Sequence, residues 1–250
     1  MIKEISILYK RKMRDTIRQP VWVVMGLTTP LLYLLLFSPL LHNAGAVTLT
    51  TKQILDSFVP GLLTLLAFTA GMGSGWDVVA DLQSGVVERL RVTPAHRFSI
   101  MLGSVLHDIT MFLIPAVIVL IISACFGFEV HVGGLVVQLV MLCFLTAIVS
   151  AWSASIGLIV KENGSVAAVM TGMQLPLTLL AGVLLPISYG PMWLQILAHI
   201  NPMYYAVEAS RSLASGVISA SAVWIAFVVL VPLCVLVLWW ATRVYKKAIK

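Results

Sequence analysis

Charged residues are scarce in this 250-residue sequence. Only 10% of the residues are Asp, Glu, Lys or Arg, whereas 60% are hydrophobic. Soluble domains carry about a quarter charged residues, so this composition excludes an ordinary soluble domain and indicates a membrane protein. Uncharged runs recur that reach the roughly 20 residues a helix needs to cross the apolar core of a bilayer. They favour an all-α membrane protein over a barrel, whose strands would be short and alternating.

Cysteine is also scarce, and the arrangement of the few cysteines excludes two classes of site. The three cysteines, Cys125, Cys143 and Cys234, all lie in apolar stretches. An odd and scattered set argues against a disulfide framework or a cysteine metal site. The five histidines have no ligand spacing either, so no metal is expected.

Motifs of nucleotide binding and catalysis are missing from the sequence. It has no Gly-x-x-x-x-Gly-Lys-Ser/Thr phosphate loop, no His-Glu-x-x-His zinc motif and no Gly-x-Ser-x-Gly nucleophile elbow. Serines within the apolar runs have no histidine or lysine partner on a neighbouring turn. The chain is therefore not expected to be an enzyme or to hold a cofactor of its own.

What the sequence does contain is a series of apolar runs separated by short polar segments, over residues 20–250. Proline-punctuated pieces around Met192–His199 and Tyr204–Ser215 predict two short helices before the last span, the first of them half-inserted in the membrane. The small residues at 71–75 are expected to let helices approach closely. Six membrane spans are predicted, at about 21–41, 57–76, 101–125, 133–160, 164–185 and 221–242.

Residues 1–19 form a separate basic segment before the first span. Residues 2–18 predict an amphipathic helix with basic residues on one face. Such a helix lies in the membrane interface with its basic face toward anionic headgroups, and a solvated basic arm is the alternative. The apolar face is expected to hold Ile2, Ile5, Tyr9, Met13 and Ile17.

The distribution of basic residues predicts the orientation of the chain in the membrane. With six spans, fourteen Lys and Arg residues fall on one side, and only Lys52 and Arg211 fall on the other. The positive-inside rule therefore places both termini and the 77–97 loop in the cytoplasm. The net charge of +6 reflects this loop placement, so nucleic acid is not an expected partner.

The most charged interior stretch is residues 77–97, between the second and third predicted spans. Gly85–Arg91 can form two turns of helix, with Val86, Val87 and Leu90 on one side and charged residues on the other. A short helix of this kind suits docking into a groove on a soluble partner. An ordinary solvated loop is the alternative.

Two acidic residues near the spans, Asp77 and Asp108, are candidates for a proton path. Both are expected at the cytoplasmic ends of their helices, within reach of headgroups and water. An interfacial or capping charge is therefore preferred to a proton relay, and a proton-coupled transporter is disfavoured.

Four segments in order along the chain carry a family resemblance. They are the basic start running into Arg18–Trp22, the Glu88–Pro94 stretch, Pro186–Leu194 and Asn201–Arg211. With these segments the chain resembles the type-2 ABC exporter permeases, in particular the daunorubicin-exporter and nodulation-oligosaccharide-exporter branch. The resemblance implies a bacterial inner-membrane subunit that pairs with a second copy of itself. Two copies of a separate ABC ATPase subunit would then bind the ATP and Mg²⁺.

The resemblance also implies roles for three groups of residues. The helix that couples to the ATPase would use Val86, Val87, Glu88, Arg89, Leu90, Arg91, Thr93 and Pro94. The N-terminal interface helix would use Lys10, Arg11, Arg14 and Arg18. The outer re-entrant helices would form a gate with Pro191, Trp193, Asn201, Pro202, Tyr205, Glu208 and Arg211.

The predicted cargo is an amphiphilic drug, antibiotic, peptide or lipid, because methionine-rich and aromatic surfaces adapt to varied hydrophobic ligands. Export of a lipid-linked oligosaccharide or polysaccharide is one alternative, and a proton-coupled secondary transporter is another. Core packing explains the candidate path residues about as well as a path does. These residues are Phe58, Phe68, Met72, Met170, Met173 and Leu177.

Overall fold

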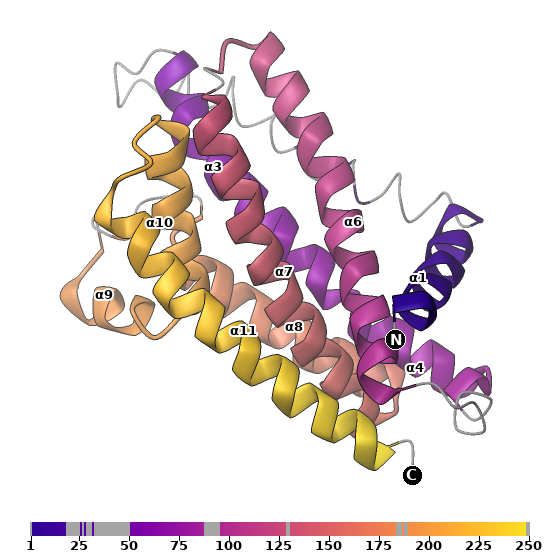
Figure 1. The fold of residues 1–250 in the computed structure, drawn as a ribbon. Helices are drawn as coiled ribbons and strands as arrows, with labels where there is room; N and C mark the ends of the chain where they lie inside the picture. The colour runs from indigo at the N-terminus through magenta and orange to yellow at the C-terminus, as the bar shows by residue number, and fades with distance from the viewer. Residues whose placement is uncertain are drawn as a thin grey trace.

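The structure is a computed structural model that describes residues 2–18, 26, 28, 32, 51–87, 96–128, 131–183, 187 and 190–248. These residues form helices and contain no strand (Figure 1), which confirms the predicted all-α class. The helices are α1 (Ile2–Ile17), α3 (Thr51–Met72), α4 (Ser74–Gln83), α6 (Arg97–Cys125), α7 (Val132–Val160), α8 (Asn163–Leu180), α9 (Met192–Ala198), α10 (Pro202–Ala214) and α11 (Ser221–Ala248).

Four segments of the described chain are long and apolar enough to cross a membrane. They correspond to the second, third, fourth and sixth predicted spans. The first predicted span, 21–41, lies outside the described residues apart from three isolated positions. The fifth coincides with α8, which ends at Leu180, before the predicted boundary, and is not among the four. The four segments found in the structure are consistent with six crossings. They are Phe58–Gln83, Phe98–Cys125, Val132–Val160 and Ser221–Ala248.

The second span differs from the prediction at both ends. Its helix begins at Thr51 and, after a break at Gly73, continues as α4 to Gln83. The expected loop at 77–97 therefore starts with helix. Charge alone suggested a loop at Asp77, but a helix forms there because Val78 and Val79 are buried as α4 packs against α7, and α1 provides partners for the aspartates on the other side.

α7 is the central helix and packs against α3, α4, α6, α10 and α11. Glycines let it approach the second span at backbone distance. A Cβ built on Gly157 would lie 2.5 Å from the Gly75 carbonyl oxygen, and one on Gly71 would lie 2.8 Å from that of Thr146. No larger residue fits these positions without moving a helix, which confirms that small residues at 71–75 serve close helix approach.

The helices divide the molecule into two ends. α1, α4 and both termini lie at one end, and α9 and α10 lie toward the other (Figure 1). The N-terminal helix α1 and α4 are therefore neighbours, although residues 18–73 lie between them in the sequence. The candidate site is built at this end.

Candidate functional site

The charged stretch after α4 begins with a tight turn. Gly85 has a φ of 69°, in the left-handed region that favours glycine. Val86 and Val87 then return to helical conformation, and Val87 is buried. The other predicted coupling residues lie outside the described residues, so their contacts stay predictions. These are Glu88, Arg89, Leu90, Arg91, Thr93 and Pro94.

Ion pairs hold α1 against α4. Arg11 Nη2 lies 2.5 Å from Asp81 Oδ1, and Lys12 Nζ lies 3.4 Å from Asp77 Oδ2. Solvent reaches both pairs, so each contributes about 0.2–1 kcal/mol. Their geometric effect is larger than their energy suggests, because together they fix the position of α4 beside α1.

The inward face of α1 differs from the predicted apolar face. Ile2 and Ile17, expected on that face, are 85% and 68% exposed. Arg11, expected to face headgroups with the other basic residues, instead turns to Asp81, so this part of the prediction is wrong. The physical reason is the acidic α4, which offers Arg11 a fixed carboxylate. The remaining interface-helix candidates are exposed, namely Lys10, Arg14 and Arg18.

Glu4 connects the start of α1 to the start of α6. Its Oε2 accepts the backbone N–H of His96, the N-cap residue of α6, at 3.1 Å. This hydrogen bond lowers the pKa of the Glu4 carboxyl below its ordinary value of 4.5. A carboxylate at this place also complements the positive end of the α6 dipole.

A buried polar cluster joins α1, α4, α6 and α7. Its centre is Asp108, which is 2% exposed. Ser150 Oγ donates to Asp108 Oδ2 at 2.6 Å, and Ser74 Oγ donates to the same oxygen. His107 Nδ1 lies 3.0 Å from Asp108 Oδ1, and its Nε2 lies 2.8 Å from Thr16 Oγ1.

The burial of Asp108 corrects the expectation that water and headgroups reach it. Asp77 is exposed, as expected for a helix end, but α1 packs against the first half of α6 and covers the region of Asp108. Reading spans one at a time does not find this cluster. The sequence does contain a sign of the cluster, because Ser74, His107 with Asp108, and Ser150 are polar residues within three separate apolar runs.

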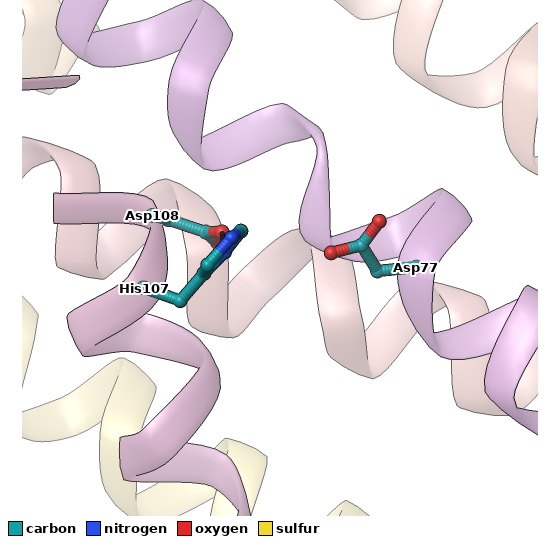
Figure 2. Close-up of side chains that lie close together, drawn as sticks. All are labelled: Asp77, His107 and Asp108. Carbon is teal, nitrogen blue, oxygen red and sulfur yellow. Dashed lines mark hydrogen bonds and ion pairs between the residues drawn. The ribbon is translucent and has the colours of Figure 1, made fainter. Parts of the chain in front are cut away.

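Side-chain atoms of Asp77, His107 and Asp108 lie within 4.8 Å of one another, close enough to share a metal ion. Figure 2 shows His107 and Asp108 side by side, with the Asp77 carboxylate facing them from another segment. Each group already has a protein partner, because Asp77 pairs with Lys12 and both His107 ring nitrogens have neighbours. The lysine ammonium also opposes a cation, so we assign this cluster to hydrogen bonding.

At the opposite end, Asn201 and Arg211 attach α10 to the end of α8. Asn201 Oδ1 caps α10, and its Nδ2 donates to the Leu177 carbonyl at 2.7 Å. Arg211 Nη2 donates to the Gly182 carbonyl at 2.6 Å, while Nη1 donates to Glu208 Oε1 at 3.0 Å. The Leu177 carbonyl also accepts the backbone N–H of Ala181, so Asn201 adds a second donor there, and Arg211 gives a donor to the Gly182 carbonyl beyond the helix end. Both donors tie α10 to the end of α8.

The other predicted gate residues surround this contact. Pro202 is the first residue of α10, where a missing N–H is tolerated. Tyr205 donates its hydroxyl to the His199 carbonyl at 2.9 Å. Pro191 precedes α9, on which Trp193 is 62% exposed. The structure therefore brings most of this set together around α8–α10 and turns Trp193 outward.

Comparison with known proteins agrees with this arrangement. The family described as ABC-2 type transporter matches residues 3–215. The chain belongs to the ABC-2 type transporter family. The predicted resemblance is thereby confirmed. The match includes both the α1–α4–α6 end and the α8–α10 contact.

Several curated relatives of this ABC-2 type transporter carry permease names. The ycf38 transport permease of Cyanophora paradoxa is 29% identical over 217 residues, which cover 86% of this chain and 75% of the relative. The daunorubicin resistance ABC transporter permease protein DrrB1 of Streptomyces coeruleorubidus is 26% identical, covering 79% and 70%. The doxorubicin resistance permease DrrC of Mycobacterium tuberculosis is 25% identical, covering 80% and 72%. These names agree with a membrane subunit that is not itself an enzyme.

The six candidate path residues of this ABC-2 type transporter separate into two groups. Met173 is 42% exposed on α8, and Leu177 is half-buried on the same helix. The other four are buried in the core of a single chain, as expected if they serve core packing and do not line a path. They are Phe58, Phe68, Met72 and Met170.

Proposed function

We propose that this ABC-2 type transporter is the membrane-spanning permease subunit of an ATP-driven exporter. Two copies form the translocation path, and two copies of a separate ABC ATPase bind ATP and Mg²⁺ and supply the energy. The observation that carries this proposal is α4, the last part of the second span, which the turn at Ser84 and Gly85 joins to Val86 and Val87 of the coupling stretch. The sequence contains no phosphate loop, so the source of energy is another chain.

The mechanism uses α4 as a rigid arm. α4 is 10 residues long, about 15 Å, and its flank is held by Arg11 and Lys12 of α1. When ATP closes the ATPase pair, the Glu88–Pro94 stretch moves with it. The α1–α4 contact carries this displacement as one unit toward the break at Gly73, and the interface between the paired permeases opens outward.

We place the exporter in a bacterial inner membrane with both termini in the cytoplasm. The support is the distribution of basic residues, with fourteen of the sixteen on the side of the termini. The end that holds α1, α4 and the termini then faces the ATPase. Anionic lipid at the same surface suits the exposed Lys10, Arg14 and Arg18.

The second copy of the permease is proposed to lie against α8. This helix exposes apolar side chains, with Met173, Leu175 and Leu179 at 42%, 65% and 61%. Met173 and Leu177 are the path candidates with exposed surface, and both lie on α8. A path between two copies would therefore be lined from α8.

The proposed cargo is an amphiphilic drug, antibiotic, peptide or lipid. The exposed apolar surface of α8 supports it, and two relatives are named for resistance to daunorubicin and doxorubicin. A lipid-linked oligosaccharide is the alternative cargo. Uptake of fluorescent doxorubicin and of a lipid-linked sugar into inverted vesicles containing the transporter separates the two.

Affinity purification with coupling-stretch variants tests the function. Tagged transporter should retain a Walker-motif ATPase, and Leu90→Asp should release it, because a carboxylate would enter an apolar groove. Glu88→Ala and Arg89→Ala should lower ATP-dependent export while the chain stays in the membrane. Val217→Asp, an equally drastic change on an exposed residue at the other end, is the matched control. Unchanged export in all three coupling variants would contradict the proposal.

One observation favours a second candidate, a proton-coupled secondary transporter. The buried His107–Asp108 pair is an ionisable group inside the apolar α6. This candidate predicts uptake driven by a pH gradient in vesicles that contain only this chain. The ABC exporter predicts no uptake under those conditions.

A further inference from the structure

Burying a carboxylate in an apolar helix is costly unless it is fully hydrogen-bonded. Asp108 lies about 17 Å along α6 from Arg97, within the segment long enough to cross a membrane. Serine hydroxyls and an imidazole nitrogen point at its oxygens, so both branches of the carboxylate are used. A buried and fully hydrogen-bonded carboxylate of this kind can hold several helices in one arrangement.

The elements meet at the break in the second span. α3 ends at Met72 and α4 begins at Ser74, which leaves backbone groups on both sides of the break without helical partners. Ser153 of α7 forms hydrogen bonds with the backbone on both sides of the break. Its Oγ donates to the Met72 carbonyl at 2.6 Å and accepts the Gly75 N–H at 2.9 Å. The break is therefore built into the packing of α7 and is not a local irregularity.

Asp108 fixes the α4 side of this break. It accepts from Ser74, the first residue of α4, where a carboxylate also complements the helix dipole. It accepts from Ser150, one turn before Ser153 on α7. Asp108 thus holds the start of α4 against α7 from a third helix. Figure 2 shows the ribbon bending before it reaches the helix that carries Asp77.

The same cluster reaches α1 through His107 and Thr16. α1 also pairs with the exposed flank of α4, through Lys12 to Asp77 and Arg11 to Asp81. The arm is consequently held at its start by Asp108 and along its flank by α1. α4 also packs against α7 and α8, and the break at Gly73 is the point where it joins α3.

We propose that Asp108 is a positioning residue for energy coupling: it sets the angle of α4 at the Gly73 break and links this hinge to α1 through His107. This inference rests on the proposed function, because the arm matters only if a partner moves its far end. Ser74 and Ser150 are the hydroxyls through which Asp108 acts. An asparagine at 108 would place a donor where one of these hydrogens now points.

The test compares Ser150→Ala with Ser155→Ala and adds Asp108→Asn. Both serines are fully buried on α7, but among the described residues the Ser155 hydroxyl bonds to its own helix, to the Ala151 carbonyl at 2.7 Å, which makes it the matched control. The first measurement is hydrogen–deuterium exchange in a peptide covering 70–80. Exchange should rise about tenfold in Ser150→Ala and Asp108→Asn and stay unchanged in Ser155→Ala.

The second measurement is the amount of doxorubicin exported per ATP hydrolysed in proteoliposomes with the partner ATPase. This ratio should fall in Ser150→Ala and Asp108→Asn while ATPase binding and hydrolysis continue, an effect that a merely structural serine would not produce. Equal ratios in Ser150→Ala and Ser155→Ala, or no change in exchange at 70–80, would overturn the proposal. If the unaltered chain shows no ATP-dependent export, the proposed function is contradicted. The hydrogen–deuterium exchange measurement would still show whether Asp108 and Ser150 fix the break at Gly73.

Discussion

At the scale of single residues, Gly157 shows how closely the helices approach. A methyl group at this position would lie 2.5 Å from the Gly75 carbonyl oxygen, which is backbone and cannot turn away. Gly157→Ala should therefore destabilise the chain by about 1–3 kcal/mol, because α7 and α4 must separate. Thermal unfolding in detergent measures the change.

The control for Gly157 is Gly172→Ala on α8, where no described residue outside the same stretch of helix comes within 4 Å of the added methyl. That substitution should be neutral or stabilising by up to about 1 kcal/mol, since alanine is the better helix former. Equal melting temperatures for the two variants would contradict the close backbone contact.

Glu4 gives the structure a dependence on pH that can be predicted in sign. The His96 N–H lowers the pKa of Glu4 in the folded state, so its contribution is present above the ordinary value of 4.5 and is lost as the pH falls through the lowered pKa. The melting temperatures of the wild type and Glu4→Gln should differ at about pH 7 and converge toward about pH 3. A difference that stays constant over this range would exclude the Glu4–His96 contact.

At the scale of elements, the proposed coupling depends on the contact between α1 and α4. Arg11→Asp and Asp81→Arg each place like charges side by side, and the double variant restores an opposite pair. Each single variant should be less stable than the double by about 0.5–1 kcal/mol, as expected for a pair that solvent reaches. ATP-dependent export should follow the same order.

A thermal-shift double-mutant cycle measures the stability part of this prediction. Arg14→Asp is the control, because Arg14 lies on the exposed side of the same helix. If Asp81→Arg does not rescue Arg11→Asp any better than it rescues Arg14→Asp, the pair does not hold α1 to α4.

Element boundaries could be predicted where one physical signal dominated. α7 begins at Val132 and ends at Val160, against a predicted 133–160, because a long uncharged run has no competing interpretation. α4 was missed because a run of charges resembles a loop until its packing against α7 and its partners on α1 are known. Likewise, the burial of Asp108 depends on the docking of α1, which no single stretch of sequence encodes.

At the scale of the whole molecule, polar chemistry is divided between two ends. One end combines α1, α4 and the buried Asp108 cluster, and the other combines α9, α10 and the end of α8. Composition predicted the membrane class and the motif order predicted the family. The internal connections of each end required the packed structure, because they join residues that are far apart in the chain.

The central claim is that a separate ATPase drives export through the segment that follows α4. Doxorubicin uptake into inside-out proteoliposomes, with and without the co-purified ATPase, tests it most directly. Uptake is expected only when the ATPase and ATP are both present, and it should be lost in Leu90→Asp. Uptake into vesicles that contain this chain alone under a pH gradient would contradict it.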